Sequence, residues 1–125
     1  MRHLFANRVF FYAGLYGLLV IAPMYFLEAK LGEDNPPAIT HPEFFYGFVG
    51  VALAWQLVFL IMSTDPARYR PLMIPAVIEK WTFGVAVMIL LSLGKVSGPT
   101  VGFACIDLVL GVLFVWSYIR TAPDA

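Results

Sequence analysis

Charged residues are scarce in this chain of 125 residues. They make up 13% of the sequence, about half of the ~25% that is usual in soluble globular domains. Hydrophobic residues account for 61%, which exceeds the roughly 45–50% of such domains. This composition excludes an ordinary soluble fold and is typical of a protein that lies in a lipid bilayer.

Other absences narrow the function. Cys105 is the only cysteine, so no disulfide can form within the chain. Eight basic residues balance eight acidic ones, which gives no support for binding nucleic acid. The sequence has no G-x-S-x-G, C-x-x-C or H-E-x-x-H motif, and we expect its two histidines, His3 and His41, on opposite sides of the membrane. We therefore expect no cofactor, no metal site and no nucleic-acid partner.

Four apolar runs are long enough to cross a membrane as helices. A hydrocarbon core of about 30 Å needs roughly 20 helical residues. The runs are Val9–Leu27, Phe44–Met62, Leu72–Leu93 and Val101–Ile119. Too few residues remain for a separate soluble domain. The sequence thus predicts an all-α fold, an antiparallel bundle of four transmembrane helices that forms one integral membrane domain over residues 1–125.

The third run is the weakest of the four. Glu79 and Lys80 interrupt it, and its charge-free part, Trp81–Leu93, is too short to cross the membrane alone. Pro71 and Pro75 fall in its first turns, where proline is tolerated because those N–H groups have few helical partners. We interpret the two prolines as the start of a helix and not as a break.

The segments between the runs carry polar residues, glycines and prolines. Residues 32–37 (Gly-Glu-Asp-Asn-Pro-Pro) predict a loop, and Thr40-x-x-Glu43 has the form of a capping box that would open the second helix. All the connections are short, so neighbouring helices should pack antiparallel.

Basic residues predict the orientation, because cytoplasmic segments carry an excess of Lys and Arg. One side of the predicted bundle holds five arginines and the other holds two lysines. The arginines are Arg2, Arg8, Arg68, Arg70 and Arg120, and the lysines are Lys30 and Lys95. We therefore expect both termini in the cytoplasm and the acidic segment 28–43 outside.

Three charged residues fall within the predicted spans. Each such charge costs about 2.5–3.5 kcal/mol on insertion scales, so these residues are the first candidates for function. Lys80 is expected to extend its ammonium to the nearby headgroups. Glu79 should lie at nearly the same depth as Gln56, so the two side chains could meet across the bundle. They would then form an interhelical hydrogen bond, or else handle a proton or a substrate.

Asp107 is the third charged residue, and it is surrounded by apolar neighbours. No basic residue in the other spans is expected at its depth, so we predict a protonated carboxyl or one that faces a wet cavity. His41 and Glu43 are its nearest candidate partners. Glu79 should differ from Asp107 in depth by roughly 12 Å at ~1.5 Å per residue, so the two would be stations on a path and not a dyad.

These residues form the set of candidate binding residues: Glu79, Asp107, Gln56, His41 and Glu43. The sequence assigns no catalytic residue. Small residues at a spacing of four indicate close helix packing instead. They form two pairs, Ala13-x-x-x-Gly17 and Gly50-x-x-x-Ala54, and Gly111 follows Asp107 on the same helix face, where it could leave space for a neighbouring side chain.

The four helices, the Glu79-Lys80 pair and Asp107-Leu108 with Gly111 resemble small bacterial four-helix membrane proteins of the DoxX-like group. The resemblance implies the bacterial inner membrane. A few members of the group are linked to redox or quinone-associated membrane complexes, so it also implies an assembly of that kind. The acidic segment 28–43 and the His41-Pro42-Glu43 stretch have no counterpart in the group.

Three functions are compatible with these features. The first is a non-catalytic small subunit or accessory of a membrane assembly, as a homo-oligomer or within a larger complex in the lipid bilayer. The second is a small proton or solute transporter that uses the intramembrane carboxylates. The third is a membrane enzyme or binding protein for a lipophilic ligand. We rank them in this order, because no catalytic motif is present.

Overall fold

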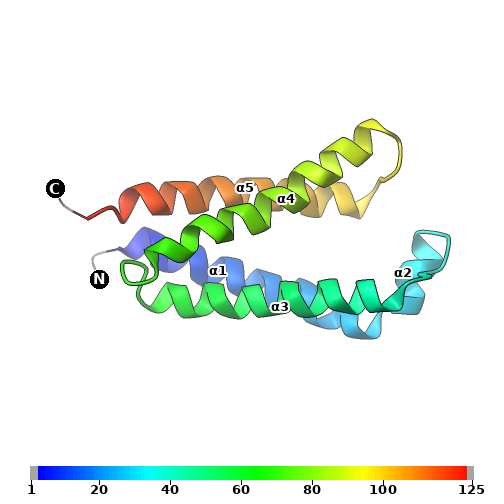
Figure 1. Cartoon of the computed structure of the whole chain (residues 1–125), viewed down its shortest axis with the longest axis horizontal. Helices are drawn as coiled ribbons and strands as arrows, with labels where there is room; N and C mark the ends of the chain where they lie inside the picture. Colours follow the sequence, from blue (N-terminus) through cyan, green and yellow to red (C-terminus); the bar gives the residue numbers. More distant parts are fainter. Residues whose placement is uncertain (1–2, 124–125) are drawn as a thin grey trace.

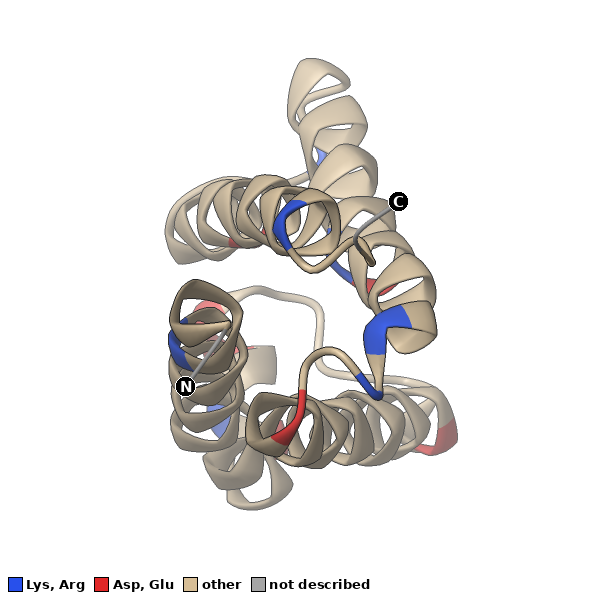
Figure 2. Cartoon of the chain, turned by 90° about the vertical axis from the view of Figure 1, so that its left-hand side faces the viewer, with Lys and Arg blue, Asp and Glu red and all other residues tan. Residues whose placement is uncertain are grey.

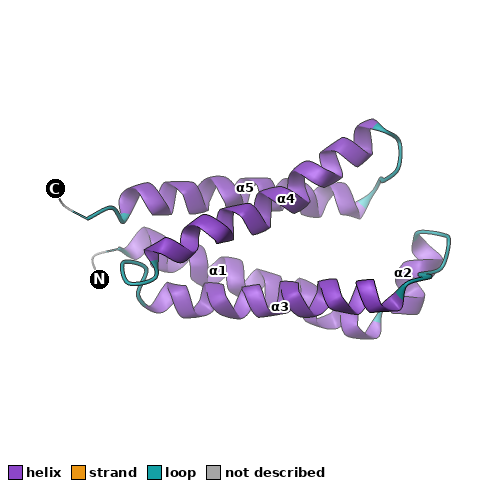
Figure 3. Ribbon diagram, viewed as in Figure 1, coloured by secondary structure: helices purple, strands orange, loops and turns teal. Residues whose placement is uncertain are grey.

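The structure is a computed structural model that describes residues 3–123, and those residues form helices and no strands (Figures 1 and 3). Arg2, one of the arginines used to predict orientation, lies outside the described residues. The helices are α1 (Leu4–Ile21), η1 (Ala22–Phe26), α2 (Glu28–Asp34), α3 (Pro42–Thr64), η2 (Arg70–Leu72), α4 (Met73–Ser92) and α5 (Pro99–Arg120). Four of the helical segments are long and apolar enough to cross a membrane: Leu4–Phe26, Pro42–Thr64, Arg70–Ser92 and Pro99–Arg120. The all-α class is confirmed, and each of the four predicted spans overlaps one of these helical segments.

The four long helices form two antiparallel hairpins. α1 packs along α3, α4 packs along α5, and a third contact joins α1 to α5. Both ends of the described chain lie at one end of the bundle together with the connection between α3 and α4, and we call this the terminal end (Figure 1). The opposite, distal end holds α2 and the turn between α4 and α5. Viewed from the terminal end, the long helices surround a common interior (Figure 2).

The two distal connections differ in build. Residues 32–37, predicted as a loop, begin within the short helix α2, which ends at Asp34, and the predicted capping box is wrong. His41, not Thr40, precedes α3, and it makes no capping hydrogen bond through its side chain. Pro42 supplies the reason, because proline at the first helical position fixes the helix start there.

The other distal connection is a compact turn that ends α4. Gly94 has a φ of +71°, a conformation that glycine adopts without steric cost. Its N–H donates to the carbonyl of Leu91 at 3.0 Å, and the N–H of Lys95 donates to Leu90 at 2.9 Å. This pair of bonds is a Schellman motif, which satisfies the last carbonyls of the helix.

Three phenylalanines from three helices form the centre of the core. Phe10 of α1 and Phe114 of α5 stack with ring centroids 4.4 Å apart, and Phe59 of α3 meets Phe114 edge-on at 5.0 Å. All three rings are fully buried. Met73 and Ala76 of α4 belong to the same cluster, so the core joins all four long helices in the terminal half of the bundle.

Each hairpin is interlocked by glycines that accept a side chain of the neighbouring helix. In the first hairpin, Gly14 and Gly17 of α1 face Leu60 and Gln56 of α3. In the second hairpin, Gly84 of α4 faces Leu108 of α5, and Gly111 of α5 faces the indole of Trp81. The predicted space beside Gly111 is therefore real, and the indole of Trp81 occupies it. Lipid tails are as apolar as these side chains, so such close fits contribute much of the packing free energy.

Gly111→Ala and Gly102→Ala form a matched pair of variants on α5. Both substitutions raise helix propensity equally, but only the Cβ at 111 overlaps the Trp81 indole, while the Cβ at 102 meets no neighbour within 4 Å. We expect Gly111→Ala to destabilise the protein by about 1–3 kcal/mol through overpacking. Gly102→Ala should be neutral or stabilising. Thermal unfolding of both variants in detergent measures the difference, and equal melting temperatures would refute the interlocking.

Candidate functional site

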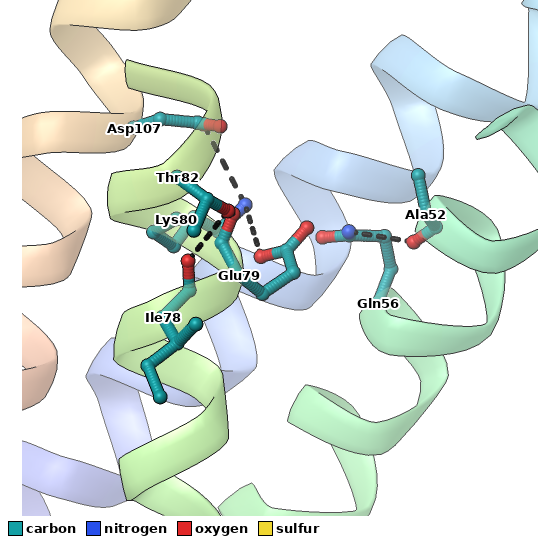
Figure 4. Close-up of polar contacts among 7 residues, drawn as sticks. All are labelled: Ala52, Gln56, Ile78, Glu79, Lys80, Thr82 and Asp107. Carbon is teal, nitrogen blue, oxygen red and sulfur yellow. Dashed lines mark hydrogen bonds and ion pairs between the residues drawn. The ribbon is translucent and has the colours of Figure 1, made fainter. Parts of the chain in front are cut away.

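The polar residues singled out within the spans gather at mid-height in the bundle. Glu79 and Lys80 come from α4, Asp107 from α5 and Gln56 from α3 (Figure 4). The aromatic core lies on their terminal side. We call the ion-paired group of Glu79, Lys80 and Asp107 the charge cluster.

Lys80 is the centre of the charge cluster. Its ammonium lies 3.6 Å from Asp107 Oδ1 and 3.7 Å from Glu79 Oε2, and the residue is only 3% exposed. The ammonium also lies 5.2 Å from the ring centroid of Phe59, close enough for a cation–π interaction with α3. One buried cation therefore contacts charged or aromatic groups on three helices.

The prediction that Lys80 extends to the headgroups is wrong, and so is the expectation that Asp107 lacks a basic partner. Counted at about 1.5 Å per residue, Lys80 lies roughly 15 Å from Arg70 at the terminal end of its helix. Asp107 lies roughly 20 Å from Arg120 on the same scale. The difference between these two distances from the terminal end is within the reach of a four-carbon side chain. Lys80 therefore turns inward, and its ammonium meets the Asp107 carboxyl.

The predicted separation of Glu79 and Asp107 is also wrong, because both carboxyls contact the same ammonium. The sequence estimate measured depth from the edges of the apolar runs. The helices themselves extend beyond those edges, to Arg70 in one span and to Pro99 in the other. The two carboxyls thus form one cluster and not two stations on a path.

Gln56 and Glu79 face each other across the interior, as predicted (Figure 4). The Gln56 amide N–H donates to the carbonyl of Ala52 at 2.8 Å, within its own helix. Gln56 Oε1 and Glu79 Oε2 are both buried and accept no hydrogen bond from any described residue. The predicted interhelical hydrogen bond is therefore not made, and two acceptor oxygens remain without a donor.

Two of the candidate binding residues lie elsewhere. His41 Nδ1 is 3.1 Å from Glu43 Oε1, and both side chains are exposed at the distal end. Asp107 has Lys80 as its partner in place of these two residues. Within residues 3–123, no three His, Cys, Asp or Glu side chains come together as metal ligands would.

Trp81 is a residue of the site that the sequence reasoning missed. Its indole N–H donates to the carbonyl of Leu108 at 3.2 Å, and its ring fills the space over Gly111. The contact fixes α4 against α5 immediately beside Lys80 and Asp107. The sequence contained one indication of this contact. Gly111 lies on the same helix face as Asp107, and a glycine there leaves a space that a large neighbouring side chain can fill.

The structure has a cleft that the charge cluster does not line. This cleft, about 760 Å³ in volume, runs between α1 and α5, and none of the three charged residues lines it. A general acid or base must come within about 2.6–3.2 Å of the group that it serves. A ligand in the cleft would therefore meet the residues that line it, and none of these belongs to the charge cluster.

Replacement of Lys80 tests the cluster energetically. Lys80→Met keeps a long unbranched side chain but leaves two half-buried carboxyls without their cation, and we expect a loss of stability of up to about 3–5 kcal/mol. Adding Glu79→Gln and Asp107→Asn to this variant should recover most of the loss. Unfolding in mixed detergent measures each variant. Lys95→Met, at an exposed lysine, is the control, and an equal effect of the two methionine variants would contradict the pairing.

Comparisons of the chain with protein-family models, with curated proteins and with solved structures find no match. The resemblance to DoxX-like proteins accordingly stays a prediction. Fold and site rest on the geometry described above, which is that of four apolar helices around a buried charge cluster.

Proposed function

We propose that this chain is a non-catalytic membrane protein that serves as a small subunit or accessory of a larger membrane assembly. The observation that carries the proposal is the position of Lys80 between Glu79 and Asp107. Its ammonium and the two carboxyls contact each other within the α4–α5 packing, so their charges serve to hold helices together.

The outward faces of the helices support the same proposal. Large apolar side chains on all four long helices are more than half exposed, among them Leu19, Val51, Ile78 and Val109. Gly47 of α3 and Gly102 of α5 have no neighbour within 4 Å of where a Cβ would lie. Small residues on an apolar face allow a helix of another membrane protein to approach closely.

A second function, proton handling, is favoured by the two acceptor oxygens that lack a donor. Gln56 Oε1 and Glu79 Oε2 are both buried, and the Glu79 oxygen lies 3.7 Å from the Lys80 ammonium. Protonation of Glu79 or a bound water molecule would supply a hydrogen-bond donor to this interior. Buried carboxyls that exchange protons are a recurrent element of proton relays in membrane proteins.

Two measurements on a tagged chain separate these functions. In native membranes solubilised with mild detergent, blue-native electrophoresis should show the chain in a band well above that of the purified chain. Reconstituted alone into liposomes, the purified chain should carry no more proton flux than empty liposomes. Migration as the isolated chain, together with a proton flux that Glu79→Gln abolishes, would refute the accessory role and support proton handling.

The orientation remains part of the proposal. Arg8, Arg68, Arg70 and Arg120 all belong to the terminal end, so we place that end in the cytoplasm. A cysteine at position 33, in a Cys105→Ser background, should react with a membrane-impermeant maleimide in intact cells. A cysteine introduced at position 68 is the matched control and should react only after permeabilisation. The reverse pattern would overturn the orientation.

A further inference from the structure

The cleft between α1 and α5 has a wall that changes from charged to apolar along its length. Arg120 belongs to the last turn of α5, and Arg8 lies one turn into α1. Deeper in the bundle the wall consists of two tyrosines, Tyr12 and Tyr16, and of apolar side chains, among them Ala13 of α1 and Leu110 and Leu113 of α5. Because the helices are antiparallel, the charged residues of both lie toward the terminal end and the apolar residues toward mid-membrane.

The length of the cleft corresponds to one leaflet of a bilayer. From Leu4 to Tyr16, the outermost and innermost lining residues of α1, the rise is about 18 Å at ~1.5 Å per residue. Half of a hydrocarbon core of about 30 Å is ~15 Å. The volume of about 760 Å³ also lies within the ~300–1,000 Å³ typical of ligand sites.

The charged mouth of the cleft continues into a smaller hollow. This hollow, of about 130 Å³, is lined by His3, Arg120 and Thr121 and shares Leu4 and Phe5 with the cleft. The Arg120 guanidinium carbon lies 5.0 Å from the ring centroid of Phe5, which holds the cation at the boundary between hollow and cleft. An apolar slot that ends in a hollow with an arginine and a histidine suits a molecule with a tail and a headgroup.

The positive charge at the terminal end of the cleft favours lipids with one kind of headgroup over another. Arg8 and Arg120 contribute two positive charges, and no ion pair joins either of them to a carboxylate in the range 3–123. A phosphodiester accepts hydrogen bonds from guanidinium groups in a fixed, often bidentate geometry. The positive charge of a choline or ethanolamine headgroup would find no described anion there, so an acidic headgroup fits better than a zwitterionic one.

We propose that this cleft binds one acidic phospholipid from the leaflet that contains the terminal end. The phosphate lies between Arg8 and Arg120, and an acyl chain lies along Ala13, Leu110 and Leu113. The site is separate from the charge cluster and goes beyond the accessory role. Such a site would make the chain associate preferentially with anionic over zwitterionic lipids, either in the surrounding bilayer or where the chain contacts other subunits of an assembly.

Native mass spectrometry of the purified full chain tests the headgroup contacts. Titrated with dioleoyl phosphatidylglycerol, the chain should retain one lipid and should prefer it at least ten-fold over dioleoyl phosphatidylcholine. Arg8→Gln and Arg120→Gln should each weaken phosphatidylglycerol binding about five-fold, the fold-change that corresponds to ~1 kcal/mol per basic residue. Arg68→Gln is the matched control, because Arg68 is exposed at the same end but lies outside the cleft.

Equal retention of the two lipids, or an equal loss with Arg68→Gln, would refute the site, because either result would indicate general attraction of anionic lipid to the basic end. Two further measurements test the acyl contacts. Leu113→Trp, which keeps both arginines and fills the slot, should reduce retained phosphatidylglycerol at least ten-fold. In the unmodified chain, excess inorganic phosphate should leave the bound lipid in place. Displacement by phosphate would mean that the mouth binds a free anion and that the lipid proposal is wrong.

Discussion

The buried ammonium of Lys80 is the interaction on which the arrangement of the helices depends. A lone cation in the hydrocarbon region is costly, and it is stable only when anionic or aromatic groups surround it. Lys80 obtains its partners from its own helix, from Asp107 of α5 and from Phe59 of α3. The requirement to satisfy one charge therefore fixes the rotation of α4 about its axis and the side on which α5 and α3 approach it.

The packing of the helices differs between the terminal side and the distal side of Lys80. Toward the terminal end, buried phenylalanines and methionines from all four long helices form one core. Toward the distal end, the second hairpin diverges from the first (Figure 1), and within the second hairpin Gly84 of α4 faces Leu108 of α5. A stacked pair, Phe48 of α3 and Phe83 of α4, spans the two hairpins there at 6.4 Å. The bundle is thus closed at one end and more open at the other.

Hydropathy was sufficient to predict the helices but not their pairing. In a bilayer both the lipid-facing and the buried faces are apolar, so periodicity does not reveal which face is inside. Gly17 and Gly111 indicated close contacts, and the structure places a neighbouring side chain against each of them, whereas Ala54 of the second predicted pair is exposed. Their polarity within the apolar runs was enough to predict Gln56, Glu79 and Asp107 as residues of the site. Polarity did not predict the direction of the Lys80 side chain, because that direction depends on where the helix begins and on which groups face the residue.

The tight turn of the second hairpin has a consequence for how the chain enters the membrane. Inserted alone, α4 would bring Lys80 into the lipid with Glu79 as its only carboxyl neighbour, and α5 alone would bring in an unpaired Asp107. Both free-energy costs fall when the two helices enter together, and the Schellman turn at Gly94 ends α4 only a few residues before α5 begins. Insertion of α4 and α5 together as one hairpin is therefore favoured over insertion of either helix alone.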